Sequence, residues 1–181
     1  MDAGLSKIKP MAKITIFGLA GTGTSSVGKL LAAKLGYTFL SSGTLFRKMA
    51  QENGLSLQDF EKLTNQDPQY DKKLDQEIKS FGEKNDNFVV ESRLAWHFIP
   101  DSIKIKLECD FETRVKRVAR RDQISFEEAR EHTEFREQMI AERYRKYYGI
   151  TDFTDEKFDL VVDTTNISIE AVVEKIEKVV I

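Results

Sequence analysis

A glycine-rich segment near the start of the chain has the residue types and spacing needed to bind phosphate. It consists of Gly18, Leu19, Ala20, Gly21, Thr22, Gly23, Thr24, Ser25 and Ser26. Its glycines let the backbone curl until its N–H groups point inward at an anion. A helix that starts directly after the loop adds the positive end of its dipole. Ser25 stands where the hydroxyl of such a loop contacts Mg²⁺. The segment therefore predicts a P-loop.

One position departs from the general pattern G-x-x-x-x-G-K-[ST]. Thr24 stands where a lysine usually brings positive charge to the β- and γ-phosphates of the nucleotide. Lys29 lies more than a helical turn further along the chain, which is too far to replace that lysine. Three interpretations stay open: other cations complete the site, the chain binds nucleotide without transferring phosphate, or the segment is an ordinary turn between a strand and a helix.

Charged residues near the ends of predicted strands can complete such a site. Arg47 lies one helical turn after Gly43, and Glu91 and Arg93 come at the end of a strand predicted at 88–90. Ligands of open α/β sheets bind at the carboxyl ends of the strands, and a guanidinium grips two phosphate oxygens at once. The glutamate can hold Mg²⁺ through water or orient an arginine. Surface ion pairs are the alternative for all three.

Two long, charged helices, predicted at 111–122 and 125–148, carry further arginines. Arg114, Arg117 and Arg121 share one face of the first helix because they are three and four residues apart, with Arg120 beside them. Arg136 and Arg143, seven residues apart, lie on one side of the second helix. Ser125 and Glu128 fit a capping box between the helices. Such helices are commonly solvated faces, but they can also form a lid that closes over a triphosphate and excludes water.

The hydrophobic pattern places these residues in alternating strands and helices. Strands are predicted at 14–17, 37–40, 88–90, 103–109 and 160–163. The other helices are predicted at 25–35, 44–53, 55–63, 67–84 and 168–180. This alternation predicts an α/β fold with a five-stranded parallel sheet covered on both faces. We expect one domain at 12–181, preceded by a flexible tail at 1–11.

Composition narrows the class of protein. The chain has 181 residues, of which 40% are hydrophobic and 32% charged, with a net charge of −2. This balance predicts no binding to nucleic acid polymers or to membranes, and no stretch approaches the ~20 apolar residues of a membrane span. The first ten residues lack the hydrophobic segment of a secretory signal. The single cysteine, Cys109, excludes an intrachain disulfide and favours a cytoplasmic setting; we expect it to be buried. We also expect a monomer.

Several segments together resemble the type 2, or archaeal-like, cytidylate kinases. In that family a threonine commonly replaces the loop lysine, in the pattern G-x-x-G-[ST]-G-T-[ST]-[ST]. The similarity continues in SSGTLFR at 41–47, DPQYD at 67–71, ESRLA at 91–95, and in Arg143-Tyr144 leading to Tyr148-Gly149-Ile150. It spans about 13–179. The segments are specific as a set, although no single one would be.

The resemblance implies a three-layer P-loop kinase fold with an acceptor-binding helical insertion at about 41–84 and a helical lid at about 117–145. It implies transfer of a phosphoryl group from ATP, with Mg²⁺, to CMP or dCMP. ATP would bind to the loop, Arg117 and Arg121, and Mg²⁺ would bind at Ser25 and Glu91. The catalytic arginines would be Arg47, Arg93, Arg117, Arg136 and Arg143. The acceptor would meet Ser42, Gly43, Arg47, Asp71, Asp75, Arg93, Arg136 and Arg143.

Three departures from the family pattern leave the acceptor base open. Ser92 stands in the middle of the family's E-G-R segment, no arginine follows Asp71 closely, and Met139 and Ile140 occupy positions that are commonly acidic. Asp71 and Asp75, one helical turn apart, contact the cytosine amino group or the ribose in one interpretation. In the other they are exposed carboxylates without a role. Kinases for another small acceptor and regulatory nucleotide-binding proteins therefore stay as alternatives.

Overall fold

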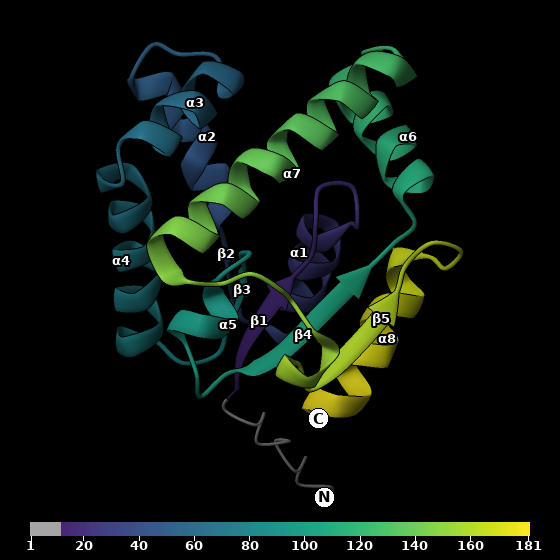
Figure 1. Cartoon of the computed structure of the whole chain (residues 1–181). Coiled ribbons are helices and arrows are strands. Elements are labelled where there is room, and N and C mark those ends of the chain that lie inside the picture. The colour runs from purple at the N-terminus through teal and green to yellow at the C-terminus, as the bar shows by residue number, and fades with distance from the viewer. Residues whose placement is uncertain (1–11) are drawn as a thin grey trace, which may run out of the picture.

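The structure of the chain is a computed structural model in which residues 12–181 are described; the tail predicted at 1–11 lies outside them. Five parallel strands form one sheet in the order β2-β3-β1-β4-β5 (Figure 1). The strands are β1 Lys13–Phe17, β2 Thr38–Ser41, β3 Phe88–Glu91, β4 Ile103–Glu108 and β5 Leu160–Asp163. All five predicted strands are confirmed, and their ends differ from the prediction by at most one residue.

Helices connect the strands and cover the sheet. They are α1 Thr24–Leu35, α2 Ser42–Glu52, α3 Leu57–Gln66, α4 Gln69–Lys84, α5 Ala95–Phe98, α6 Phe111–Asp122, α7 Phe126–Tyr148 and α8 Ile169–Val180, with a 3₁₀ turn at Asp155–Lys157. Every long helix is confirmed. The sequence pattern missed α5 and the 3₁₀ turn, because a stretch of three or four residues is too short to show a helical period. None of the described helices is long and apolar enough to cross a membrane.

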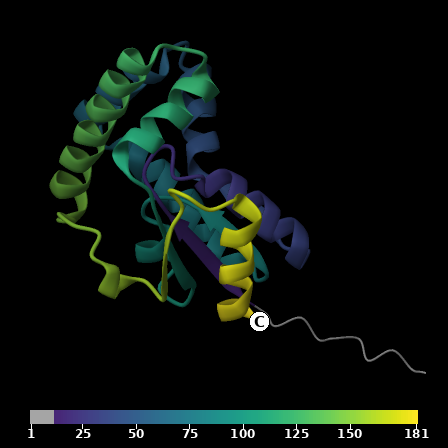
Figure 2. The same cartoon turned by 90° about the vertical axis from the view of Figure 1, so that its right-hand side faces the viewer.

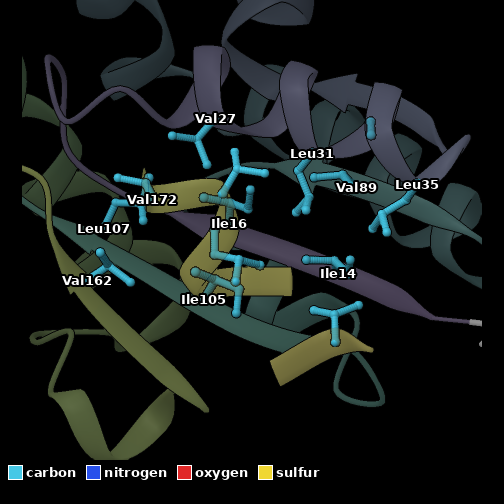
Figure 3. Close-up of a cluster of buried hydrophobic side chains, with 14 of the residues drawn as sticks. Ile14, Ile16, Val27, Leu31, Leu35, Val89, Ile105, Leu107, Val162 and Val172 are labelled. Carbon is cyan, nitrogen blue, oxygen red and sulfur yellow. The ribbon is translucent and has the colours of Figure 1, made fainter. Parts of the chain in front are cut away.

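One face of the sheet packs against α1 and α8. Ile14 and Ile16 point to this face from β1, because alternate residues of a strand share a side, and both are fully buried. Figure 3 shows both below Leu31 of α1, with Ile16 near Val172 of α8. Thr15, between them, faces the other way and lies 2.9 Å from the hydroxyl of Ser102. Each buried isoleucine stabilises the fold by about 1.5–3 kcal/mol relative to an exposed one.

The opposite face supports the helical insertion. Phe88 and Val90 of β3 point to this face and are fully buried in a second core with Phe60 of α3 and Ile78 of α4. Val89, between them, belongs to the first core. A central strand of a parallel sheet is buried on both faces, so β3 joins the two cores and fixes the insertion to the sheet.

The helices α6 and α7 form the hairpin predicted as a lid. They pack through a third core at Val115, Val118 and Ala129. Ser125 caps α7, because its hydroxyl accepts a hydrogen bond from the Glu128 N–H at 3.1 Å, as predicted. Figure 1 shows α7 crossing from α6 toward α4, and Figure 2 shows the hairpin on the side of the sheet away from α8. α7 also packs on α3, so the lid touches the insertion.

Candidate active site

A cleft of about 690 Å³ opens at the carboxyl ends of the strands, between the phosphate loop, the insertion and the lid helices. It brings together most of the residues predicted for the site. These are Gly18, Leu19, Ala20, Gly21, Thr22, Gly23, Thr24, Ser25, Ser26, Ser42, Gly43, Arg47, Glu91, Arg93, Arg117, Arg121 and Arg136. The remaining three, Asp71, Asp75 and Arg143, line a small adjoining hollow of about 40 Å³ instead.

The loop between β1 and α1 has a backbone that only glycine adopts freely. Gly21 and Gly23 have φ angles of 86° and 92°, in the left-handed region. A Cβ atom on Gly21 would lie 2.5 Å from the carbonyl oxygen of Arg114. Gly23 precedes α1 without a side-chain cap, so the first amides of this helix keep free donors. The loop therefore offers backbone N–H groups to an anion in the cleft.

Glu91 at the end of β3 organises the hydroxyl groups beside this loop. Its carboxylate accepts hydrogen bonds from Thr24 Oγ1 at 3.0 Å, Ser25 Oγ at 3.1 Å and Ser41 Oγ at 2.5 Å. Thr24 is buried, and its side chain is directed at the carboxylate. The residue in the lysine position thus helps to fix Glu91.

Ser25 and Glu91 have the donor chemistry that Mg²⁺ prefers. A hydroxyl and a carboxylate supply hard oxygen ligands, and here they lie within hydrogen-bond distance of each other. Within residues 12–181 no group of three or more His, Cys, Asp or Glu side chains is placed to hold a metal by itself. The pair fits a Mg²⁺ ion that takes its other ligands from phosphate oxygens and water, which is the usual arrangement for this ion.

Two of the predicted lid arginines are held by polar groups of the chain. Arg117 donates to the carbonyl oxygens of Thr164 at 2.8 Å and Gly21 at 3.3 Å, so it ties α6 to the phosphate loop. Arg121 makes a two-point ion pair with Asp122, with both N–O distances at 2.7 Å.

The predicted burial of Cys109 is wrong: its thiol is half-buried and lies 3.5 Å from Arg117 Nη1.

Arg47 and Arg93 have no acidic partner among the described residues. Arg47 is exposed at the cleft, and its Nη2 donates to Thr44 Oγ1 at 3.3 Å. Arg93 lines both the cleft and the hollow, and its buried Nε has no hydrogen-bond acceptor. The surface ion pairs considered from the sequence are not observed. An unpaired guanidinium in such a position favours the binding of an anion.

The hollow lies between α2, α4 and α7, and Arg143 of α7 lines one side of it. The guanidinium of Arg143 is 5% exposed and contacts Glu61 Oε2 at 2.7 Å, Asn65 Oδ1 at 2.9 Å and Asp71 Oδ2 at 3.0 Å. These acidic and amide partners direct Arg143 toward the insertion. Arg143 therefore does not lie over the phosphate loop, where a lid arginine over the triphosphate would be.

Asp71 and Asp75 face the same hollow, so the interpretation of both as exposed carboxylates is wrong. Burial raises the pKa of Asp71 to about 6, against the opposing effect of Arg143. Burial and the nearby Asp71 raise the pKa of Asp75 to about 7, and the Tyr148 hydroxyl donates a hydrogen bond to this carboxyl. Ser92 also lines the hollow and is buried.

Residues outside the predicted set also belong to the site. Glu61 of α3 holds two arginines in its buried carboxylate, Arg120 lines the cleft, and Thr164 accepts from Arg117. Glu61 had a signal in the sequence, because it lies four residues after Leu57 and next to Phe60 on the face that a helix buries. A charged residue in that position requires a buried partner.

Comparison with known proteins identifies the family of the chain. A model of the cytidylate kinase-like family matches residues 13–166, which include the phosphate loop and both arginine-bearing helices. The chain belongs to the cytidylate kinase-like family. The cytidylate kinase of Methanosarcina acetivorans is 42% identical over 157 residues, covering 84% of this chain and 87% of that protein. The cytidylate kinase of Ignicoccus hospitalis is 39% identical, covering 94% and 100%.

Solved structures support the fold of this cytidylate kinase-like chain. A shikimate kinase from Bacteroides thetaiotaomicron superposes with a TM-score of 0.59 at 16% identity, covering 94% of this chain and 98% of that one. An uncharacterized protein from Eubacterium ventriosum gives a TM-score of 0.67 at 20% identity, covering 92% and 96%. At these identities the likeness concerns the three-layer fold alone.

Proposed function

We propose that this protein transfers the γ-phosphoryl group of ATP to CMP or dCMP. The observation that carries the proposal is the convergence, in one cleft, of the phosphate loop, the Ser25–Glu91 pair and six arginines from different parts of the fold. Membership of the cytidylate kinase-like family and relatives named cytidylate kinase support a cytidine nucleotide as the acceptor. The kinase assignment rests on the site, and the choice of base rests on the relatives.

The loop amides would bind the triphosphate of ATP, with Arg117 and Arg121 nearby on α6. Mg²⁺, held with Ser25 and Glu91, would neutralise charge on the β- and γ-phosphates. Thr24 brings no charge, so the compensating cations come from arginines of the insertion, β3 and the lid. Arginine suits this task because its planar fork contacts two phosphate oxygens. The presence of these cations in the cleft argues against the alternative of a regulatory protein that binds nucleotide without transferring phosphate.

The acceptor phosphate would meet Arg47, Arg93 and Arg136, and the nucleoside would lie toward Ser42, Gly43, Asp71, Asp75 and Arg143. An oxygen of the acceptor phosphate attacks the γ-phosphorus of ATP, the bond from this phosphorus to the β–γ bridging oxygen breaks, and ADP leaves. A phosphate monoester is largely a dianion at neutral pH, so the attacking oxygen needs no general base. Catalysis then depends on positioning and on charge stabilisation.

The acceptor must open the hollow as it binds. The space between the insertion and α7 measures only about 40 Å³, roughly the room of one or two water molecules. A pyrimidine ring requires more. We therefore expect α7 and the insertion to separate when CMP enters and to close again around it, as lids of this kind do.

We place the protein in the cytoplasm as a monomer that acts on nucleotides and not on nucleic acid polymers or membranes. Size-exclusion chromatography with light scattering tests the assembly, and a particle near 20.8 kDa is expected. A particle of twice that mass would contradict the proposed monomer and leave the kinase proposal intact.

The deciding experiment is chromatography of the products formed from ATP and Mg²⁺ with CMP, dCMP, UMP, AMP or GMP. CDP or dCDP as the dominant product is expected. Another diphosphate as the dominant product would keep the kinase and overturn the cytidine assignment. ATP binding with no diphosphate from any acceptor would support the regulatory alternative.

A sharper test of the proposed acceptor site is Arg47→Ala. We expect the KM for CMP to rise about tenfold or more, because one charged contact to phosphate contributes about 1.5–3 kcal/mol, while ATP binding changes little. Lys48→Ala is the matched control, since Lys48 is the exposed neighbour on α2 and pairs with Glu52 at 3.8 Å. Equal losses of CMP and ATP affinity in Arg47→Ala would contradict the assigned role.

A further inference from the structure

Glu61 is the most buried carboxylate near the cleft, and it lies where the insertion meets the lid. Its side chain is 2% exposed, and its two oxygens have different partners. Oε2 accepts from Arg143 Nη1 at 2.7 Å, and Oε1 accepts from Arg136 Nε at 2.7 Å. A carboxylate removed from water in this way must be fully paired, and these two arginines of α7 provide the pairing from a single helix.

Arg143 fixes Glu61 in place. The Arg143 guanidinium itself contacts Asn65 and Asp71, so it belongs to a group of paired side chains from α3, α4 and α7. With Oε2 bound to this group, the carboxylate of Glu61 cannot turn freely. Its other oxygen, Oε1, then defines a fixed point for Arg136.

Arg136 is held by its Nε alone. Among the described residues, no acceptor takes a hydrogen bond from its two Nη nitrogens, and the residue lines both the cleft and the hollow. These Nη donors are therefore available to an anion bound in the cleft or the hollow. Arg93 lies near enough for its charge to lower the pKa of Arg136, after the larger effect of burial. Without the carboxylate of Glu61, repulsion by Arg93 and the cost of burying an unpaired charge would displace Arg136 from this position.

We propose that Glu61 is a positioning residue for phosphoryl transfer, which holds Arg136 with its free nitrogens toward the acceptor phosphate at the boundary between cleft and hollow. The inference rests on the proposed function. Glu61 touches no substrate in this scheme and acts only through Arg136. Because Glu61 belongs to the insertion and Arg136 to the lid, the contact also requires the two regions to be together when the acceptor is bound.

Two substitutions test the proposal. Glu61→Asp keeps the buried charge but shortens the side chain by one methylene, so it cannot reach both arginines; Glu61→Gln removes the charge. We expect kcat/KM for CMP to fall about tenfold to a hundredfold in either variant, the cost of misplacing a positioning group by about 1 Å. The KM for ATP should stay within about twofold, since the loop that binds ATP is not touched.

Thr64→Val is the matched control for stability. Thr64 is fully buried one turn along the same helix, and its hydroxyl donates to the backbone carbonyl of Glu61. This variant disturbs α3 without touching the carboxylate. Equal losses of kcat/KM in Thr64→Val and Glu61→Asp would overturn the proposal, and so would an unchanged KM and kcat in a folded Glu61→Asp protein.

A double-mutant cycle separates positioning from a general structural role. If Glu61 acts through Arg136, adding Glu61→Asp to Arg136→Ala should lower kcat/KM for CMP by less than about twofold, because the group being positioned is already absent. The proposal would be overturned if Glu61→Asp lowered kcat/KM for CMP as much in the Arg136→Ala background as it does in the wild type. The wild type is measured first, because a wild-type protein that makes neither CDP nor dCDP would refute the proposed function instead.

Discussion

Asp75 and Asp71 lie in the acceptor hollow with raised pKa values, about 7 and about 6, so stability should depend on pH. Both carboxyls bind protons more tightly in the folded chain than in the unfolded one, where the value is near 3.8. The free energy of unfolding therefore falls as the pH rises from about 4 to about 7. The charge of Arg143 opposes this effect, because it lowers the pKa of both carboxyls.

Asp75→Asn tests this pH dependence. The amide oxygen can still accept from Tyr148, but the ionisation is lost. We expect the variant to melt a few degrees above the wild type at pH 8 and at nearly the same temperature at pH 4. Glu77→Gln, at an exposed position of the same helix, serves as the control. A melting difference that is constant across this pH range would contradict the assigned burial of Asp75.

Gly21 is the residue of the phosphate loop that tolerates substitution least. An added Cβ would meet the backbone of Arg114 at 2.5 Å, at a φ of 86°. We expect Gly21→Ala to lose ATP binding in a calorimetric titration, because the loop must move away from α6. Gly54→Ala provides the control: φ there is 66°, and nothing lies within 4 Å of the added atom. That variant should cost only about 1–2 kcal/mol of backbone strain and bind ATP normally; weaker ATP binding in it would count against the steric explanation.

At the scale of elements, the strands and long helices were predictable because each carries its own pattern. The alternating residues of β1 and the buried stripe of α1 are local signals. The junction of α3 with α7 was not predictable in this way. Arg143 was expected at the acceptor, but its ion pairs with Glu61 and Asp71, which are distant in sequence, could not be inferred from the pattern. A residue's type and helix face can be inferred from sequence, whereas its partner across an interface depends on packing.

The start of α7 offers a test of how the lid is held. Ser125 caps this helix with its hydroxyl, so Ser125→Ala should cost about 1 kcal/mol and lower the melting temperature by about 2–4 °C for a chain of this size. Ser125→Asp restores an acceptor at the same position and should restore the melting temperature. An alanine variant with the same melting temperature as the wild type would show that the core of the hairpin alone fixes the helix end.

For the whole molecule, β3 joins the two large cores, since Val89 belongs to one and Phe88 and Val90 to the other. We therefore expect a single unfolding transition. ATP with Mg²⁺, at about 100 times its dissociation constant, should add about 2.7 kcal/mol and raise the melting temperature by about 5–10 °C. CMP should add a separate increment. A shift with ATP and none with CMP would argue against the acceptor site.

The cations that line the cleft are all arginines among the described residues: Arg47, Arg93, Arg117, Arg120, Arg121 and Arg136. With Thr24 in the loop, the cleft offers no amine to a chemical or enzymatic acyl donor. Acetylation, a common way to neutralise a lysine, therefore has no target in this cleft. Reagents that modify amines should spare the activity, and dicarbonyl reagents, which attack guanidinium groups, should abolish it unless ATP protects the cleft.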